Sequence, residues 1–96
     1  PIYIPNVISA NSDGINDQLT AYGNHAATGI RQFQVFDRWG GLTWERNNFE
    51  LNDATLGWDG TEKNKPVNPG VYSYVAVVDF LDEIPLTFHG TVTVLR

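Results

Sequence analysis

The strongest β-strand signal in the chain is the run Asn68-Pro69-Gly70-Val71-Tyr72-Ser73-Tyr74-Val75-Ala76-Val77-Val78-Asp79. Its Pro69-Gly70 pair predicts a turn, because proline presets one backbone dihedral and glycine accepts a positive φ without a steric penalty. The residues that follow are mostly β-branched or aromatic, which are the types that favour strands.

Alternate side chains of a strand point to opposite faces of the sheet. Here the first face is large and aromatic, and the second face is also mostly apolar. The first consists of Tyr72, Tyr74, Ala76, Val78 and Phe80, and the second of Val71, Ser73, Val75 and Val77. A strand with two apolar faces is typical of a sheet centre that is covered on both sides. We therefore expect residues 71–80 to form the central strand.

Shorter segments with strand-like patterns lie on both sides of this run and are separated by turn-forming residues. They are residues 2–8, 18–22, 30–37, 42–46 and 85–95. The turn Arg38-Trp39-Gly40-Gly41 predicts that residues 30–37 and 42–46 form a hairpin. No helical period of convincing length occurs. The pattern predicts an all-β protein, an immunoglobulin-like antiparallel β-sandwich of about seven strands, with a small barrel as the alternative.

Composition narrows the classes of partner. Residues 1–96 have the length of a single domain, and their net charge of −5 disfavours nucleic acid and anionic membranes, which bind positive surfaces. No apolar run is long enough to span a bilayer, and there is no cysteine. Since the chain opens on Pro1 and has no methionine, we expect it to be part of a longer protein.

Catalysis finds no support in the residue pattern. His25 and His89 do not stand in a metal-ligand spacing, and the chain contains neither a cysteine nucleophile nor a Gly-x-Ser-x-Gly elbow. We expect His89 to be a strand residue that faces solvent. The sequence therefore predicts that this domain is not an enzyme.

The polar loop of residues 9–17 has two interpretations. Oxygen-bearing side chains at alternate positions followed by Gly14 resemble the start of a calcium loop, whose ligands would be Asn11, Asp13, Asn16 and Asp17. However, Thr20 stands where such loops carry a glutamate. The alternative, which we favour, is that these side chains bond to neighbouring backbone in tight turns. The sequence predicts no other cofactor.

Three tryptophans could either close the core or form a sugar-binding platform. Trp39 and Trp58 each stand beside glycine, which suits a large ring that packs over a tight turn, so we expect both to be buried. Trp44 could serve either role. In Gly57-Trp58-Asp59-Gly60, the carboxylate of Asp59 is placed to form an Asx-turn.

Five blocks of the chain resemble the gliding-motility-associated C-terminal domain, the type B sorting domain of type IX secretion substrates. Residues 4–17 resemble its opening I-P-N-x-F-S-P-N-G-D-G-x-N-D, and residues 37–40 resemble N-R-W-G. Residues 57–60 match G-W-D-G, residues 68–74 resemble P-P-G-V-Y-x-Y, and residues 90–96 resemble G-x-V-T-L-I-R. The motif positions that we single out are Pro5, Asn6, Gly14, Arg38, Trp39, Gly40, Trp58, Asp59, Gly60, Pro69, Gly70, Tyr72 and Tyr74.

The resemblance implies a non-catalytic sorting signal that directs a large cargo protein through the type IX machinery to the surface or exterior of a Gram-negative bacterium. The domain would stand at the C-terminus of that cargo and would be monomeric in isolation. Its partners would be outer-membrane components of the machinery, and the terminal residues Val94, Leu95 and Arg96 are candidate recognition positions. The alternatives are an adhesive or carbohydrate-binding β-sandwich module and a structural spacer.

Overall fold

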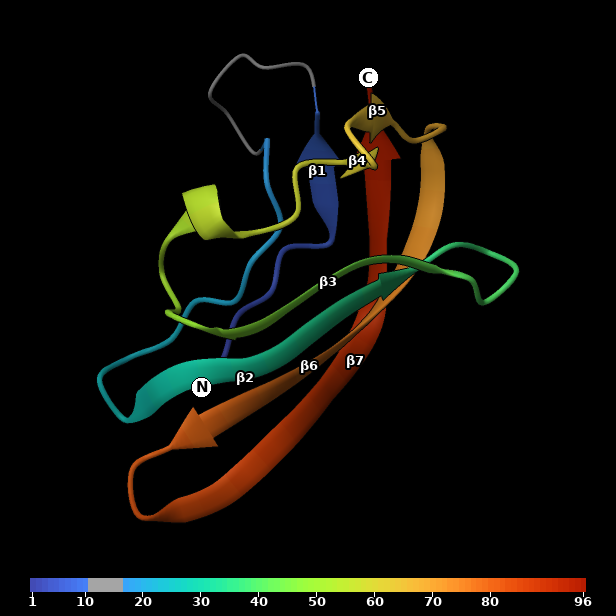
Figure 1. The fold of residues 1–96 in the computed structure, drawn as a ribbon. Helices are drawn as coiled ribbons and strands as arrows, with labels where there is room; N and C mark the ends of the chain where they lie inside the picture. The colour runs from blue at the N-terminus through green and yellow to red at the C-terminus, as the bar shows by residue number, and fades with distance from the viewer. Residues whose placement is uncertain (11–16) are drawn as a thin grey trace.

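The computed structural model describes residues 1–10 and 17–96 and consists mainly of β-strands (Figure 1). The only helical element in the described residues is a 3-10 turn, η1 (Ala54–Leu56). The strands are β1 (Val7–Ser9), β2 (Ala27–Phe36), β3 (Leu42–Phe49), β4 (Thr61–Glu62), β5 (Lys65–Pro66), β6 (Gly70–Phe80) and β7 (Glu83–Leu95). The expected all-β class and the expected number of strands are confirmed.

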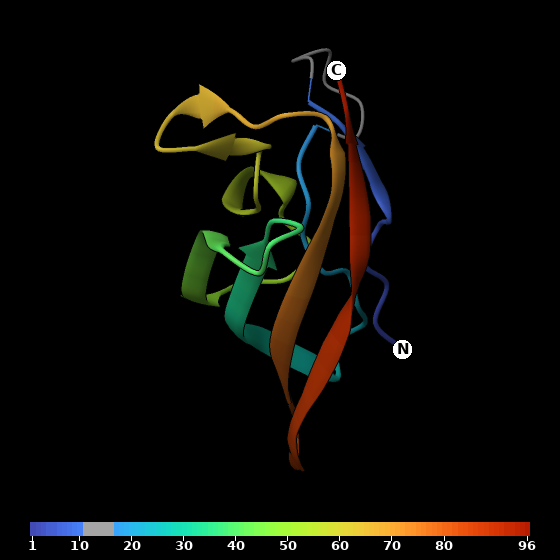
Figure 2. The ribbon, with the colours of Figure 1, turned by 90° about the vertical axis from the view of Figure 1, so that its right-hand side faces the viewer.

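The main sheet has the strand order β1-β7-β6-β2-β3, and β4 and β5 form a separate hairpin. The predicted central position of β6 is confirmed, as is the β2–β3 hairpin. Figure 2 shows that the sheet is strongly twisted, with β2 and β3 on one side of the β6–β7 pair. Such twist follows from the right-handed preference of L-residues in extended conformations.

One pairing departs from the antiparallel expectation, because β1 runs parallel to β7 through Val7↔Thr93, Ile8↔Val94 and Ser9↔Leu95. Strand β1 begins only after Pro5, since proline lacks the N–H that a paired strand needs. Residues 18–22, predicted as a strand, form only two isolated bridges, Tyr3↔Tyr22 and Leu19↔Trp58.

The two faces of β6 differ in burial. Tyr72, Ala76 and Val78 are buried, whereas Val71 and Ser73 on the other face are exposed. Val75 and Val77 on that face are half-buried, so the expected cover on both sides is found for the first face and only in part for the second. The segments that cross the sheet pack over the first face, where their side chains join the same core as those of β6. These side chains include Leu19, Leu51 and Trp58.

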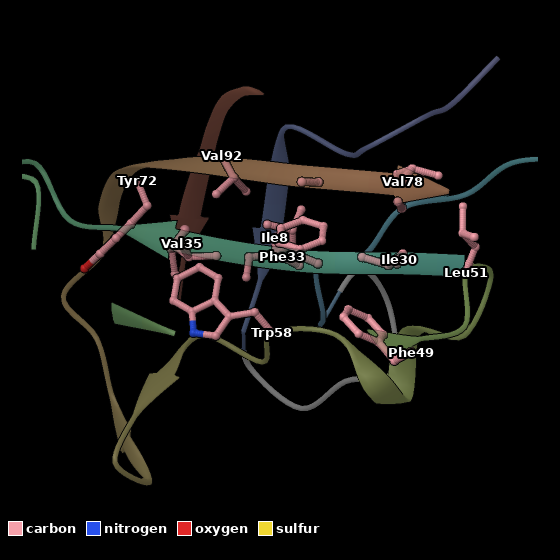
Figure 3. Packing of buried hydrophobic residues seen from close by; sticks show 14 residues of the cluster. Ile8, Ile30, Phe33, Val35, Phe49, Leu51, Trp58, Tyr72, Val78 and Val92 are labelled. Atoms are coloured by element: carbon pink, nitrogen blue, oxygen red, sulfur yellow. The ribbon is translucent and has the colours of Figure 1, made fainter. Parts of the chain in front are cut away.

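Trp58 lies at the centre of this core, as predicted, and is fully buried (Figure 3). Its ring centroid lies 5.5 Å from that of Tyr72, which is also buried as predicted. Its indole N–H donates a hydrogen bond of 2.8 Å to the carbonyl of Thr61, so the polar atom of this buried side chain is satisfied. Tyr74 is half-buried against Phe33, with their ring centroids 5.7 Å apart.

Trp39 is not in the core. Its side chain is 84% exposed, so the prediction of burial was wrong. The chain reverses between Asp37 and Gly41, and this places Trp39 at the tip of the β2–β3 hairpin, away from the sheet. The guanidinium of Arg38 lies 5.4 Å from the centroid of the Trp39 ring. Proximity to glycine reflects a turn here, not a core contact.

The different environments of the two tryptophans predict different costs of truncation. Trp58→Ala should lower the free energy of unfolding by about 3–5 kcal/mol, because it leaves a large cavity in the core. Trp39→Ala is the matched control and should change it by less than about 0.5 kcal/mol. Urea denaturation measures both values. Equal midpoints for Trp58→Ala and the wild type would contradict the assigned core.

Candidate functional site

The segments that carry the sequence motifs meet at one end of the sheet. Figure 1 shows the end of β7, the end of β1 and the β4–β5 hairpin at this end of the molecule. Three hydrogen bonds from the side chain of Arg96 join them. Its Nη1 donates to the carbonyl of Ala10 at 2.7 Å, and its Nη2 donates to the carbonyls of Gly60 and Val67, both at 2.9 Å. We call this arrangement the Arg96 clamp.

The three candidate recognition residues have different environments. The side chain of Val94 is fully buried in the core, which leaves it out of reach of a partner. Leu95 is 48% exposed. Arg96 is exposed, but its guanidinium is engaged by backbone carbonyls of the same chain. The sequence indicates Arg96 only as a candidate recognition position and does not predict these intramolecular bonds. The G-x-V-T-L-I-R motif ends in arginine, and this position in the motif could have indicated that Arg96 has a structural role.

Three residues near Trp58 fix its position, namely Gly57, Asp59 and Gly60. A Cβ on Gly57 would lie 2.1 Å from the carbonyl oxygen of Leu19, so only glycine allows the paired backbones of Leu19 and Trp58 to approach this closely. The carboxylate of Asp59 accepts hydrogen bonds from the backbone N–H and the hydroxyl of Thr61, which is the predicted Asx-turn. Gly60 has a φ of 81° beside Ala10.

The Asp37–Gly41 reversal presents Arg38 and Trp39. The carboxylate of Asp37 accepts hydrogen bonds from the backbone N–H groups of Trp39 and Gly41, at 2.9 and 2.8 Å, and Gly40 has a φ of 83°. A groove of about 520 Å³ lies beside this turn, with Trp39 and Tyr72 among its lining residues. Lys63 and Lys65 also line it, and Glu62 adds an opposite charge. The surface is thus polar, with one exposed aromatic ring.

Tyr72 fixes the Pro69-Gly70 turn from inside the sheet. Its hydroxyl donates a hydrogen bond of 2.7 Å to the carbonyl of Asn68, four residues earlier. Burial of the ring raises the pKa of Tyr72 above its ordinary value of 10.0, and the negative charge of Asp37 raises this pKa further. Tyr74 faces Gly90 across the β6–β7 pair, and a Cβ on Gly90 would lie 2.8 Å from the tyrosine hydroxyl.

Most of the possible calcium ligands fall on Asn11, Asp13 and Asn16, which lie outside the described residues, as does Gly14. Asp17 is described and lines a groove together with Asp59 and Arg96. Among the described residues, no three acidic or histidine side chains gather in an arrangement that could hold a metal ion.

The opening motif contributes backbone contacts. Asn6 directly follows Pro5, and its backbone carbonyl accepts a hydrogen bond of 2.8 Å from the N–H of Thr93. This bond starts the pairing of β1 with β7. His89 is exposed on β7, as predicted. None of the helical residues in the described part of the chain forms a segment long and apolar enough to cross a membrane.

Comparison with known proteins identifies one family. The family model described as "CHU_C Type IX secretion signal domain" matches residues 2–94, which is nearly the whole chain. No curated protein matches the chain.

The Arg96 clamp leads to a prediction about stability. Arg96→Ala should lower the free energy of unfolding by about 1–2 kcal/mol, because the carbonyls of three residues lose a partly exposed charged donor. Arg96→Lys keeps the charge but cannot reproduce the planar fork, so it should recover only part of the loss. Urea midpoints of the three proteins test this, and coincident curves for Arg96→Ala and the wild type would show that the clamp contributes nothing.

The raised pKa of Tyr72 predicts a loss of stability in alkali. A tyrosine whose pKa is higher in the folded state stabilises that state fully below the ordinary value of 10.0, and the contribution disappears as the pH rises through the folded pKa. Tyr72→Phe should lose about 1 kcal/mol at pH 7 with its hydrogen bond, yet decline less steeply than the wild type above pH 10. Denaturation midpoints measured from pH 7 to 11 give both slopes, and parallel curves would refute the assignment.

Proposed function

The chain belongs to the type IX secretion signal domain family, and from this premise we propose that its folded surface is what the export machinery recognises. As a member of that family, the domain is a sorting signal that directs export to the bacterial cell surface or exterior. We propose that its partners are outer-membrane components of the machinery in a Gram-negative host and that the cargo is a larger protein joined to it.

The observation that carries the proposal is the family match, and the roles of the motif residues support its reading as a folded label. Gly57 permits a close backbone approach, Trp58 fills the core, Asp59 closes a turn and Arg96 ties three segments together. Each role builds the fold and supplies no reacting group. Residues with these roles hold the chain in one folded shape, and we propose that a receptor recognises the surface of that shape. We therefore propose that the domain is non-catalytic.

The adhesive alternative is less well supported by the positions of the tryptophans. A sugar-binding platform needs aromatic faces that are open to solvent together. Trp58 is fully buried, and Trp44 is half-buried with its ring 5.9 Å from Phe33 and 6.4 Å from Phe49. Trp39 alone of the three is exposed, at the tip of a hairpin. The family match points to sorting, and nothing about the tryptophans outweighs it.

A reporter fusion tests the sorting role. A soluble reporter that enters the periplasm should reach the medium or the cell surface of a type IX-competent host when this domain is fused after it. It should stay inside when the domain is left out or when the host lacks the machinery. The Trp39→Ala fusion, whose domain should be as stable as the wild type, serves as a folded variant in the same export assay. Equal export with and without the domain would refute the proposed function.

Gly57→Val asks whether the folded shape is required. The branched side chain would collide with the backbone of Leu19 and should prevent the native pairing, since even a Cβ alone comes within 2.1 Å of the carbonyl oxygen. Export of the reporter should therefore be lost in this variant. Full export from a Gly57→Val fusion whose purified domain shows no cooperative unfolding would mean that a linear segment is recognised instead.

A further inference from the structure

One edge of the sheet is open along most of its length. Strand β7 has 13 residues and pairs with β6 from Glu83 to Val94. On its other side, β1 covers only Thr93, Val94 and Leu95. Among the described strands, none pairs with the outer side of residues 83–92. Figures 1 and 2 show this part of the β6–β7 hairpin projecting beyond the rest of the domain.

The β1 pairing shows which backbone groups of β7 face outward. The N–H of Thr93 donates to Asn6, and the carbonyl of Leu95 accepts from Ala10 at 3.1 Å, so these odd-numbered residues direct their polar groups to the outer edge. The register with β6 is unbroken between residues 86 and 94, so the alternation continues along the strand. Thr91, His89 and Thr87 therefore present their N–H and C=O groups outward, and all three residues are exposed.

This open edge lacks the features that usually block pairing with another chain. Proteins protect edges with short strands, charged side chains, proline or bulges. The edge strand β1 has three residues, and the opposite edge strand β3 carries Glu45, Arg46 and a positive φ at Asn48. Residues 86–92 of β7 contain no lysine, arginine, acidic residue or proline. The open segment is bounded by Pro85 at one end and by β1 at the other.

The tip of the hairpin indicates the chemistry of what would bind there. Leu81 and Ile84 are 61% and 78% exposed, and Leu86 is 44% exposed. Asp82 and Glu83 stand between them and are also exposed. A matching partner would place apolar side chains against the leucines and isoleucine and a basic side chain near the two carboxylates. A second copy of the domain fits less well, since it carries the same net charge of −5.

We infer that residues 86–92 of β7 form a docking edge that receives an extended strand of the export machinery, with apolar side chains and a basic residue near the hairpin tip. The incoming strand would pair with the outer side of β7, along the residues that precede the segment paired with β1. Its backbone would bond to Thr87, His89 and Thr91, and alternate side chains would supply selectivity. This inference rests on the proposed sorting function and names the surface that would carry it.

The test compares His89→Pro with His89→Ala in the reporter fusion. Proline removes the outward N–H of His89 and leaves the bonds to β6 in place, whereas alanine keeps the backbone donor. Export should fall about tenfold in the proline variant, as expected for one unmade backbone bond that leaves its partner unsatisfied. Export should stay near the wild-type level in the alanine variant. Melting curves of the purified variants verify that each is folded.

Glu83→Lys tests whether the hairpin tip contacts the partner, and it changes no backbone group. If His89→Pro fails to fold, this variant tests the docking edge in its place. A positive charge there should repel a basic partner and reduce export, while Glu50→Lys, at another exposed position, should not.

The outcomes separate the two proposals. If the wild-type fusion is not exported, the sorting function itself fails. If the wild type is exported and both His89→Pro and Glu83→Lys match it, the docking edge is refuted and the sorting function stands. A dimer in sedimentation that His89→Pro abolishes would assign the edge to a second copy and overturn the inference.

Discussion

Three parts of the domain are held to the end of β7 by the guanidinium of Arg96. This group bonds to the exit of β1, the turn after Trp58 and the loop before β6, and the first of these contacts, to Ala10, spans 86 residues of sequence. None of these segments is long enough to pair extensively with the sheet. A planar cation with several donors can satisfy several carbonyl oxygens at once, which a neutral side chain of similar size cannot do. The clamp therefore adds to the few backbone hydrogen bonds at this end of the sheet, which run from Ala10 to Leu95 and from Val67 to Gly60.

The core next to the clamp depends on close backbone approaches as much as on large side chains. Trp58 fills the space over β6 only because Gly57 lets the backbone of Leu19 come within bonding distance. A second close approach lies between β6 and β7, where the side chain of Tyr74 covers Gly90. One glycine thus makes room for a backbone and the other for an aromatic ring, and both allow dense packing.

Local signals in the sequence predicted much of the sheet. The Pro69-Gly70 turn and the alternation after it located β6 at the centre, and the Asx-turn at Asp59 followed from the residue type and its neighbours. The misses concern relations between distant segments. No local pattern distinguishes a tryptophan at a hairpin tip from one in a core, so Trp39 was misplaced. The parallel pairing of β1 and the carbonyl partners of Arg96 depend on long-range topology, which the composition of a short segment does not encode.

The pairing of the first strand with the last has a consequence for how the domain folds. Residues 7–9 meet residues 93–95, so this contact closes a loop of more than 80 residues. Closing such a loop lowers the entropy of the chain before the new contact contributes any favourable free energy. Sheets that depend on contacts of this kind therefore fold slowly, over milliseconds to seconds. The chain therefore remains incompletely folded until its last strand is available. Because β7 also forms half of the central β6–β7 hairpin, the main sheet is complete only when residues 93–95 have reached both of their neighbours, β1 and β6.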